Sequence, residues 1–396
     1  MAMLESARQE PPHTAFYNDP VVRGIIYQVI VGVVLVVFVS WIVHNTSVNL
    51  AAQGKTTGFD FLGKTAGFGI SFSLFAFDRT SFYWQAFLVG LTNTLLVAVI
   101  GIFFATLLGF TIGIARLSSN FIVSRLATIY VETIRNIPLL LQLFFWYFAV
   151  LKAMPAVRNS LALPLDIFIN QRGLFVPRPM PDAQFGWVYI ALLIGLVGAF
   201  VLRRWAMLRL EATGKRFPVA LSSIALVVVV VAVVWLVSGA AVTFDPPVLN
   251  RFNFNGGLEL PPEFVALAFG LTIYTASFIA ETVRGGILAV SHGQTEAAQS
   301  LGLKEGDRLR LVVVPQAMRV IIPPLTSQYL NLIKNSSLGA AIGFPELVNV
   351  FTGTTLNQTG RAVEVIALTM LVYLIISLST SALMNWYNAR VALVER

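Results

Sequence analysis

Eight long apolar segments occur along this chain, and they restrict its fold more than any other feature. A helix needs about 20 mostly apolar residues to cross the hydrocarbon of a bilayer. With 57% hydrophobic and only 12% charged residues, the chain carries more apolar surface than one soluble core could bury. The sequence therefore predicts an all-α, polytopic membrane protein with about eight transmembrane helices. The predicted spans are Gly24–Val43, Trp84–Ala115, Leu126–Leu151, Gly186–Leu202, Pro218–Ser238, Pro262–Thr282, Pro324–Phe344 and Val363–Leu383.

Basic residues orient these spans. Eight crossings leave both termini on one side of the membrane, and short loops rich in Lys and Arg favour the cytoplasm. The first span is too long for the core of a signal peptide, so we expect it to remain as an anchor. The strongest orienting signal, which favours cytoplasmic termini, is the cluster of Arg203, Arg204, Arg209, Lys215 and Arg216.

Several kinds of site are not expected. The formal net charge of +8 belongs mostly to loops beside apolar segments, so no nucleic-acid partner is predicted. The chain has no cysteine, and His13, His44 and His292 are far apart in sequence, so no metal site is predicted. We find no nucleophile–base pair or carboxylate dyad, and therefore predict no catalytic residue.

One segment, Gly58–Thr65, fits the nucleotide-binding pattern G-x4-G-K-[ST]. A phosphate-binding loop needs a buried strand before it and a helix after it, whose N–H groups face the phosphates. Here the preceding residues are polar and turn-like, and no amphipathic helix follows. We interpret the segment as a flexible loop outside the cytoplasm, so ATP hydrolysis would have to come from a partner.

Small residues in the second span indicate close helix packing. Gly109 and Gly113 form a G-x3-G pair, which lets two membrane helices approach. The run Val227–Val234 is expected to face lipid or to fill the core.

The most informative polar segment is Glu296–Pro315, which lies between strongly apolar segments. Its first residues are good helix formers, and Gly302 can end a helix in the left-handed conformation, so we expect a helix of about two turns. Small Ala297 and Ala298 would permit close approach to a partner, and Glu296 would make a polar contact. A charged turn is expected to follow, and Pro315 would mark the return to the bilayer. The turn comprises Lys304, Glu305, Asp307 and Arg308.

The spacing of this segment resembles EAA-x3-G-x9-I-x-L-P, the cytoplasmic coupling loop of the membrane subunits of binding-protein-dependent ABC importers. Val312 and Val314 stand at the Ile and Leu positions. Other segments resemble motifs of the polar amino-acid branch, the histidine/glutamine-type permeases. The long form of the chain is similar to the Q-type permease subunit of the general L-amino-acid importers of Gram-negative bacteria. The further matching segments are Gly90–Leu95, Tyr130–Phe144, Ser277–Ile287 and Asn331–Leu338.

This resemblance implies a five-helix permease core plus three extra helices in the bacterial inner membrane. Residues 1–83 would form an anchor helix and outer loop, and 152–262 an insertion with two further helices. The core would comprise 84–151 and 263–385, the second part with the coupling loop, and 386–396 would be a cytoplasmic tail. The implied ATPase-coupling residues are Glu296, Ala297, Ala298, Gly302 and Pro315.

The resemblance also implies the partners. We expect a cytoplasmic ABC ATPase dimer, a second and distinct permease subunit, a periplasmic amino-acid-binding protein, and membrane lipid. The chain itself would bind no cofactor, because ATP binds the partner subunit.

Charged residues inside the spans are candidates for a substrate pathway. A spacing of three places Glu132 with Arg135, and Glu281 with Arg284, on one helical face, where each pair can neutralise itself. Charges within a bilayer are costly and usually face a cavity or a partner, and a cavity with both signs would suit an amino acid. The same pairs could instead be structural locks or interface residues, and both interpretations remain open. The candidate pathway residues are Glu132, Arg135, Glu281, Arg284, Asn331 and Lys334.

The sequence therefore predicts a non-enzymatic subunit that carries L-amino acids across the inner membrane, driven by ATP hydrolysis on a partner. An ion-coupled secondary amino-acid transporter is the first alternative. It would need internal repeats with paired broken helices, and although Pro138 and the Pro323-Pro324 pair could mark breaks, we find no convincing repeat. A membrane scaffold or receptor subunit would explain the docking segment but not the intramembrane charges.

Overall fold

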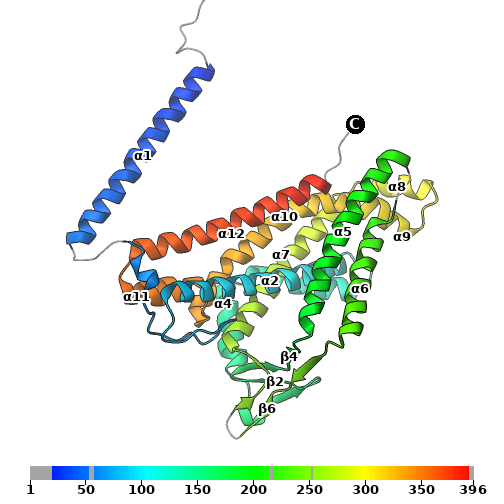
Figure 1. Cartoon of the computed structure of the whole chain (residues 1–396). Helices are drawn as coiled ribbons and strands as arrows, with labels where there is room; N and C mark the ends of the chain where they lie inside the picture. Colours follow the sequence, from blue (N-terminus) through cyan, green and yellow to red (C-terminus); the bar gives the residue numbers. More distant parts are fainter. Residues whose placement is uncertain (1–19, 53–57, 215–216, 251–252, 392–396) are drawn as a thin grey trace, which may run out of the picture.

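The computed structural model describes residues 20–52, 58–214, 217–250 and 253–391, and most of these are helical (Figure 1). Among them, seven helical segments are long and apolar enough to cross a membrane, or eight if the bent pair of α3 and α4–η3 is one span. The predicted helical membrane fold is confirmed; Lys215 and Arg216 of the orienting cluster lie outside the described residues. The long helices are α1 (Pro20–Ala52), α2 (Tyr83–Ala115), α5 (Phe185–Thr213), α6 (Val219–Ser238), α7 (Pro262–Leu288), α10 (Val314–Asn335) and α12 (Ala362–Val391).

Shorter helical elements connect or extend these helices. They include three π-helical stretches, η3, η5 and η7, and three 3-10 helices, η2, η4 and η6. Their bounds are η2 (Asp60–Gly63), α3 (Phe121–Asn136), α4 (Leu139–Phe144), η3 (Phe145–Leu151), η4 (Val157–Asn159), α8 (His292–Ser300), α9 (Glu305–Arg308), η5 (Leu309–Val313), η6 (Ser336–Ile342), η7 (Val348–Thr355) and α11 (Leu356–Thr359).

The third predicted span, Leu126–Leu151, is not one straight helix, because α3 and α4–η3 meet at an angle of 105°. Pro138 explains the break, since a residue that precedes proline is disfavoured in the helical conformation. Ile137 accordingly adopts extended angles, with φ −100° and ψ 128°. The side-chain amide of Gln142 donates to the carbonyl oxygens of Ile134 and Ile137 at 2.8 and 2.9 Å, which satisfies groups that the bend exposes.

The seventh predicted span, Pro324–Phe344, begins too late. α10 already begins at Val314 and contains both Pro323 and Pro324. A proline inside a helix removes one backbone hydrogen bond and crowds the carbonyl four residues earlier. Because prolines are therefore expected at the start of a helix rather than inside it, the pair indicated the beginning of the span. Membrane helices tolerate such prolines where their neighbours hold the chain, and Ile321, two residues before Pro323, is buried in the core.

α2 and α7 pack closely through the G-x3-G pair. A Cβ atom added at Gly109 would lie 2.6 Å from the Cβ of Ile279, and one at Gly113 would lie 2.7 Å from the carbonyl oxygen of Ala280. Any larger side chain would therefore push the two helices apart. Gly286 of α7 faces α10 in the same way. The predicted packing role of Gly109 and Gly113 is confirmed, and α7 lies at the centre of the core.

Three helices lie outside this core. In Figure 1, α1 stands apart from the other helices, and none of its residues with described side chains is buried. α5 and α6 form a hairpin that packs tightly where Gly195 approaches Val227, whose Cα would lie 3.2 Å from an added Cβ. No residue of α6 is buried, which agrees with a lipid-facing Val227–Val234.

The 152–262 insertion also contains strands, which the prediction of an all-α protein missed. They lie at the end of the α5–α6 hairpin away from α8 (Figure 1). With two to four residues each, and prolines among them, these strands are too short to produce the alternating pattern that predicts a sheet. One antiparallel sheet has the order β1 (Leu161–Leu163), β2 (Ile167–Asn170), β3 (Gly173–Val176) and β8 (Leu258–Leu260); two further pairs are β4 (Arg178–Pro181) with β5 (Val242–Asp245), and β6 (Val248–Leu249) with β7 (Phe254–Asn255).

The segment Gly58–Thr65 does not have the geometry of a phosphate-binding loop. Its central residues form η2, and the residues from 66 to 82 contain no helix. Lys64 pairs with Asp60 at 3.2 Å, and its hydrogen bond holds the pKa of that carboxyl below the ordinary value. Phe61 is buried in a cluster with residues of α2, η7 and α12, so the predicted flexible loop is wrong and the segment is packed.

Candidate functional site

The predicted short helix of the polar segment is α8, and a Schellman motif closes its C-terminus. The N–H of Gly302 donates to the carbonyl of Gln299 at 2.9 Å, and the N–H of Leu303 donates to the carbonyl of Ala298 at 3.2 Å. Gly302 has a φ of +71°, a left-handed conformation that glycine adopts readily and that costs other residues about 1–2 kcal/mol. The predicted helix and its glycine end are both confirmed.

The exposed face of α8 carries polar and apolar groups. Glu296 and Ala297 are exposed, and the Glu296 carboxylate lies 2.9 Å from Nδ1 of His292. Leu301, at the end of the helix, is 80% exposed, whereas Ala298 is only 3% exposed. Ala298 is covered by its own chain, in which α8 contacts η5 and α9, so the prediction that it approaches a partner is wrong. Sequence reasoning missed Leu301, whose signal is a large apolar side chain at the end of a polar helix.

The chain after Gly302 is helical, where a turn was expected. Of the four charged residues predicted there, only Lys304 precedes α9, which runs into η5 and then α10 without a break. The π-helical stretch η5 ends two residues before Pro315, where it can accommodate a residue that lacks an N–H and crowds the preceding turn. Pro315 lies in the first turn of α10, and the amide of Gln316 donates to Gln294 of α8 at 3.1 Å. α8 is therefore joined to α10 by a hydrogen bond.

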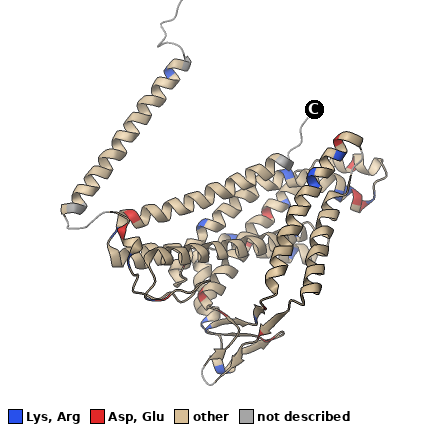
Figure 2. Cartoon of the chain, viewed as in Figure 1, with Lys and Arg blue, Asp and Glu red and all other residues tan. Residues whose placement is uncertain are grey.

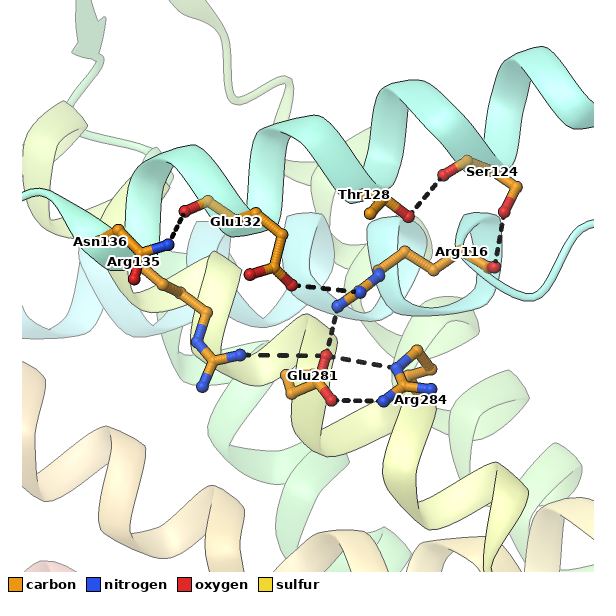
Figure 3. A network of polar contacts seen from close by, with 8 residues as sticks. All are labelled: Arg116, Ser124, Thr128, Glu132, Arg135, Asn136, Glu281 and Arg284. Carbon is orange, nitrogen blue, oxygen red and sulfur yellow. Dashed lines mark hydrogen bonds and ion pairs between the residues drawn. The ribbon is translucent and has the colours of Figure 1, made fainter.

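A network of five charged side chains joins α2, α3 and α7 (Figure 3). Arg116, directly after α2, forms an ion pair with Glu281 of α7 and lies 3.5 Å from Glu132 of α3. Glu281 also pairs with Arg284 at 2.6 Å and lies 4.0 Å from Arg135 of α3. The predicted Glu281–Arg284 pair is confirmed. The predicted neutralisation of Glu132 by Arg135 is wrong, because each side chain reaches a partner on another element.

This network contains three arginines and two glutamates, so it carries one positive charge in excess. The Nε atoms of Arg116 and Arg135 are buried and have no hydrogen-bond partner among the described residues. The Arg116 side chain is only 10% exposed, whereas that of Glu132 is 56% exposed. An excess cation in a partly open, low-dielectric site attracts an anion such as a carboxylate. Sequence reasoning missed Arg116, because it directly follows the apolar run of α2 and resembles an ordinary loop residue.

Asn331 and Lys334 lie on an exposed part of α10. No ion pair or hydrogen bond among the described residues joins their side chains to the network of Figure 3. Lys334 is thus a cation within a membrane-length helix that the described part of the chain does not neutralise. Such a residue usually faces a cavity or a partner.

Known proteins with similar sequences are membrane components of transport systems. The family described as "Binding-protein-dependent transport system inner membrane component" matches residues 191–393. The general L-amino acid transport system permease protein AapQ of Rhizobium johnstonii is 53% identical over 378 residues, which cover 96% of this chain and 94% of that protein. The Escherichia coli protein YhdX is 48% identical, with 96% and 97% covered. BztB of Rhodobacter capsulatus, a glutamate/glutamine/aspartate/asparagine transport system permease protein, is 39% identical, with 98% and 99% covered.

Proposed function

Because the chain belongs to the family of binding-protein-dependent transport system inner membrane components, we propose that it is a permease subunit that carries L-amino acids across the bacterial inner membrane. The names of its relatives support this substrate class. The observation that carries the proposal is α8, a capped helix with Glu296 and Leu301 on its exposed face and a hydrogen bond to α10. The family relationship does not support the ion-coupled alternative.

The energy source and the partners belong to this proposal. ATP binds to and is hydrolysed by a separate cytoplasmic ABC ATPase dimer, and this chain holds no cofactor. A second, distinct permease subunit completes the pathway, and a periplasmic binding protein delivers the amino acid. The end of the bundle that carries α8 faces the cytoplasm, as do both termini. Charged residues, including basic ones of α5, gather at that end in Figure 2, which supports this orientation.

The coupling contact is made by the exposed side of α8. Leu301 enters an apolar groove of the ATPase, while Glu296 makes a polar contact and Ala297 permits close approach. Gly302 ends the helix, and Ala298 and Pro315 fix it on the permease itself. A protein partner suits this surface, because an isolated, strongly exposed leucine becomes buried only when a partner covers it.

The substrate pathway runs past the network of Figure 3. Its excess positive charge attracts the substrate carboxylate, and the exposed carboxylate of Glu132 is available to the ammonium group. Arg135, Glu281 and Arg284 complete this polar wall. Asn331 and Lys334 line the pathway from α10, on the side where the second permease subunit would lie. The buried pair of Arg116 and Glu281 joins α2 to α7, so we assign it a structural role in addition.

Uptake of radiolabelled amino acids by proteoliposomes that contain the complete importer tests the proposal. Wild-type uptake should require ATP and the binding protein, and uptake driven by an ion gradient without ATP would refute it. Arg135→Gln and Lys334→Gln should raise the KM for transport while the complex still assembles. Arg79→Gln removes an exposed loop cation and should change nothing. If every pathway variant instead failed to assemble, the charges would be structural locks. In that case each substitution leaves a partner charge unpaired in a low-dielectric environment, which destabilises the complex.

A further inference from the structure

A cavity of about 720 Å³ lies between α5 and the C-terminal part of α12. Its α5 wall consists of Phe200, Arg203, Arg204 and Met207, and its α12 wall is Trp386. The α5 residues are three and four positions apart, so they share one face of that helix. The chain therefore leaves a space between two membrane helices, with two cations among large apolar side chains.

Among the residues that the structure describes, the two cations of this cavity have no acidic partner. None of the ion pairs formed by the described residues includes Arg203 or Arg204, and both residues are exposed. Arg209 of the same helix differs, because its guanidinium lies 5.3 Å from the centre of the Trp205 ring and does not line the cavity. Two guanidinium groups that no described carboxylate neutralises, close to the end of a membrane helix, would attract an anion.

The cavity is also not closed by protein. α5 makes its main contacts with α6, whereas α12 packs against α10 and η7. Both helices are long and apolar enough to cross a membrane, so in a bilayer the gap between them would open to lipid. An occupant must therefore offer both an anion and apolar surface.

We propose that this cavity binds an anionic phospholipid, whose phosphodiester lies on Arg203 and Arg204 and whose acyl chain lies between α5 and α12. Guanidinium groups match phosphate oxygens through paired hydrogen bonds. Phe200 and Met207 provide apolar contacts for the acyl chain, and the indole of Trp386 suits the boundary between hydrocarbon and headgroups. Inorganic phosphate alone would leave these apolar walls uncovered. The bound lipid would fasten the α5–α6 hairpin to the core.

Native mass spectrometry tests this site independently of the proposed transport function. The full chain, with whatever subunits accompany it, is taken from phosphatidylcholine nanodiscs that contain a small fraction of phosphatidylglycerol, and the retained phosphatidylglycerol is counted. The Arg203→Gln/Arg204→Gln variant should bind it about 30-fold more weakly, which corresponds to about 2 kcal/mol, because each basic residue near an anionic headgroup contributes about 1 kcal/mol. Wild-type retention by this variant overturns the proposal.

Further measurements distinguish a lipid site from a free-anion site and from a protein interface. Arg209→Gln removes one charge from the same helix but not from the cavity, so it should retain phosphatidylglycerol as the wild type does; a loss equal to that of the double variant would overturn the site. Excess inorganic phosphate should not displace the lipid, and displacement would indicate a free-anion site instead. Loss of an accompanying subunit from the Gln variant, with lipid retention unchanged, would identify a protein interface. If the Gln double variant fails to assemble, Arg203→Gln alone decides: retention weaker by about 5-fold, which corresponds to about 1 kcal/mol, supports the site, and wild-type retention overturns it.

Discussion

The left-handed conformation of Gly302 gives a quantitative test of the coupling helix. No atom lies within 4 Å of a Cβ added at Gly302, so a substitution there causes no clash, and its effect comes from the backbone alone. With φ at +71°, Gly302→Ala costs about 1–2 kcal/mol. That energy changes the ratio of capped to uncapped α8 about 5–30-fold. Since Leu301 directly precedes this residue, uncapping changes the position of the side chain proposed to enter the ATPase.

We therefore expect Gly302→Ala to lower coupled amino-acid uptake, by at most about 5–30-fold, the limit reached when the uncapped form dominates. Basal ATP hydrolysis and membrane insertion should stay unchanged. The assay measures uptake and the ATP hydrolysis stimulated by loaded binding protein, in proteoliposomes that contain the complete importer. Gly306→Ala is the matched control, because that glycine lies in α9 with open space around it and a helical backbone.

Two further variants at the same position separate backbone conformation from charge. Asparagine tolerates the left-handed region, so Gly302→Asn should keep most of the uptake. Aspartate has a similar shape but adds a negative charge at the C-terminal end of α8, which costs about 0.3–1 kcal/mol more. Gly302→Asp should therefore transport less than Gly302→Asn. Equal uptake by the Ala variant and the wild type, at equal expression, would refute the reasoning.

Three other predictions concern packing and topology. Gly109→Leu should lower the thermal midpoint of the complex, since its added Cβ lies 2.6 Å from Ile279 and overpacking costs about 1–3 kcal/mol; Gly69→Leu, in open space, should not. Arg361→Gln should destabilise the packing of residues 58–63, measured as faster amide hydrogen exchange there, because buried Arg361 pairs with Asp60 at 2.9 Å; unchanged exchange would contradict this role. Reporter fusions at positions 210 and 300 should report the cytoplasm, and those at 170 and 355 the periplasm, whereas a periplasmic signal at 210 would rule out the eight-crossing topology.

Sequence reasoning succeeded where one element contains the whole signal. The end of α8 depends on Gly302 and the residues just before it, and the contact of α2 depends on the spacing of Gly109 and Gly113. Each feature follows from backbone geometry within one or two turns. The break at Pro138 was not predicted, since Leu126–Leu151 was expected to be one span, and its angle of 105° depends on tertiary packing.

Sequence reasoning failed to identify contacts in which the partner of a residue lies on another element of the chain. Spacing alone favoured Glu132 with Arg135, but Arg116 follows a different helix and lies 3.5 Å from Glu132 only because α2 and α3 lie against each other. The strands of the insertion pair β3 with β8, whose registered residues Phe175 and Glu259 are far apart in sequence. Pairings of this kind depend on tertiary structure, which local patterns do not contain.

The coupling helix and the charged network are connected through α7. α7 ends at Leu288, and only three residues separate it from α8; the first of these, Ala289, still donates its N–H to the carbonyl of Gly285 at 3.0 Å. On the other side, α8 is bonded to Gln316 of α10, and α10 packs on Gly286 of α7. A displacement of α8 can therefore reach α7 through two short connections: the covalent link between the two helices, and the packing of α10 on α7. Since Glu281 lies on α7 and holds three arginines around it, a shift of this helix changes the distances within the network. Closely packed helices slide or rotate as units rather than deform, so a displacement of α8 would reach the proposed substrate pathway through α7.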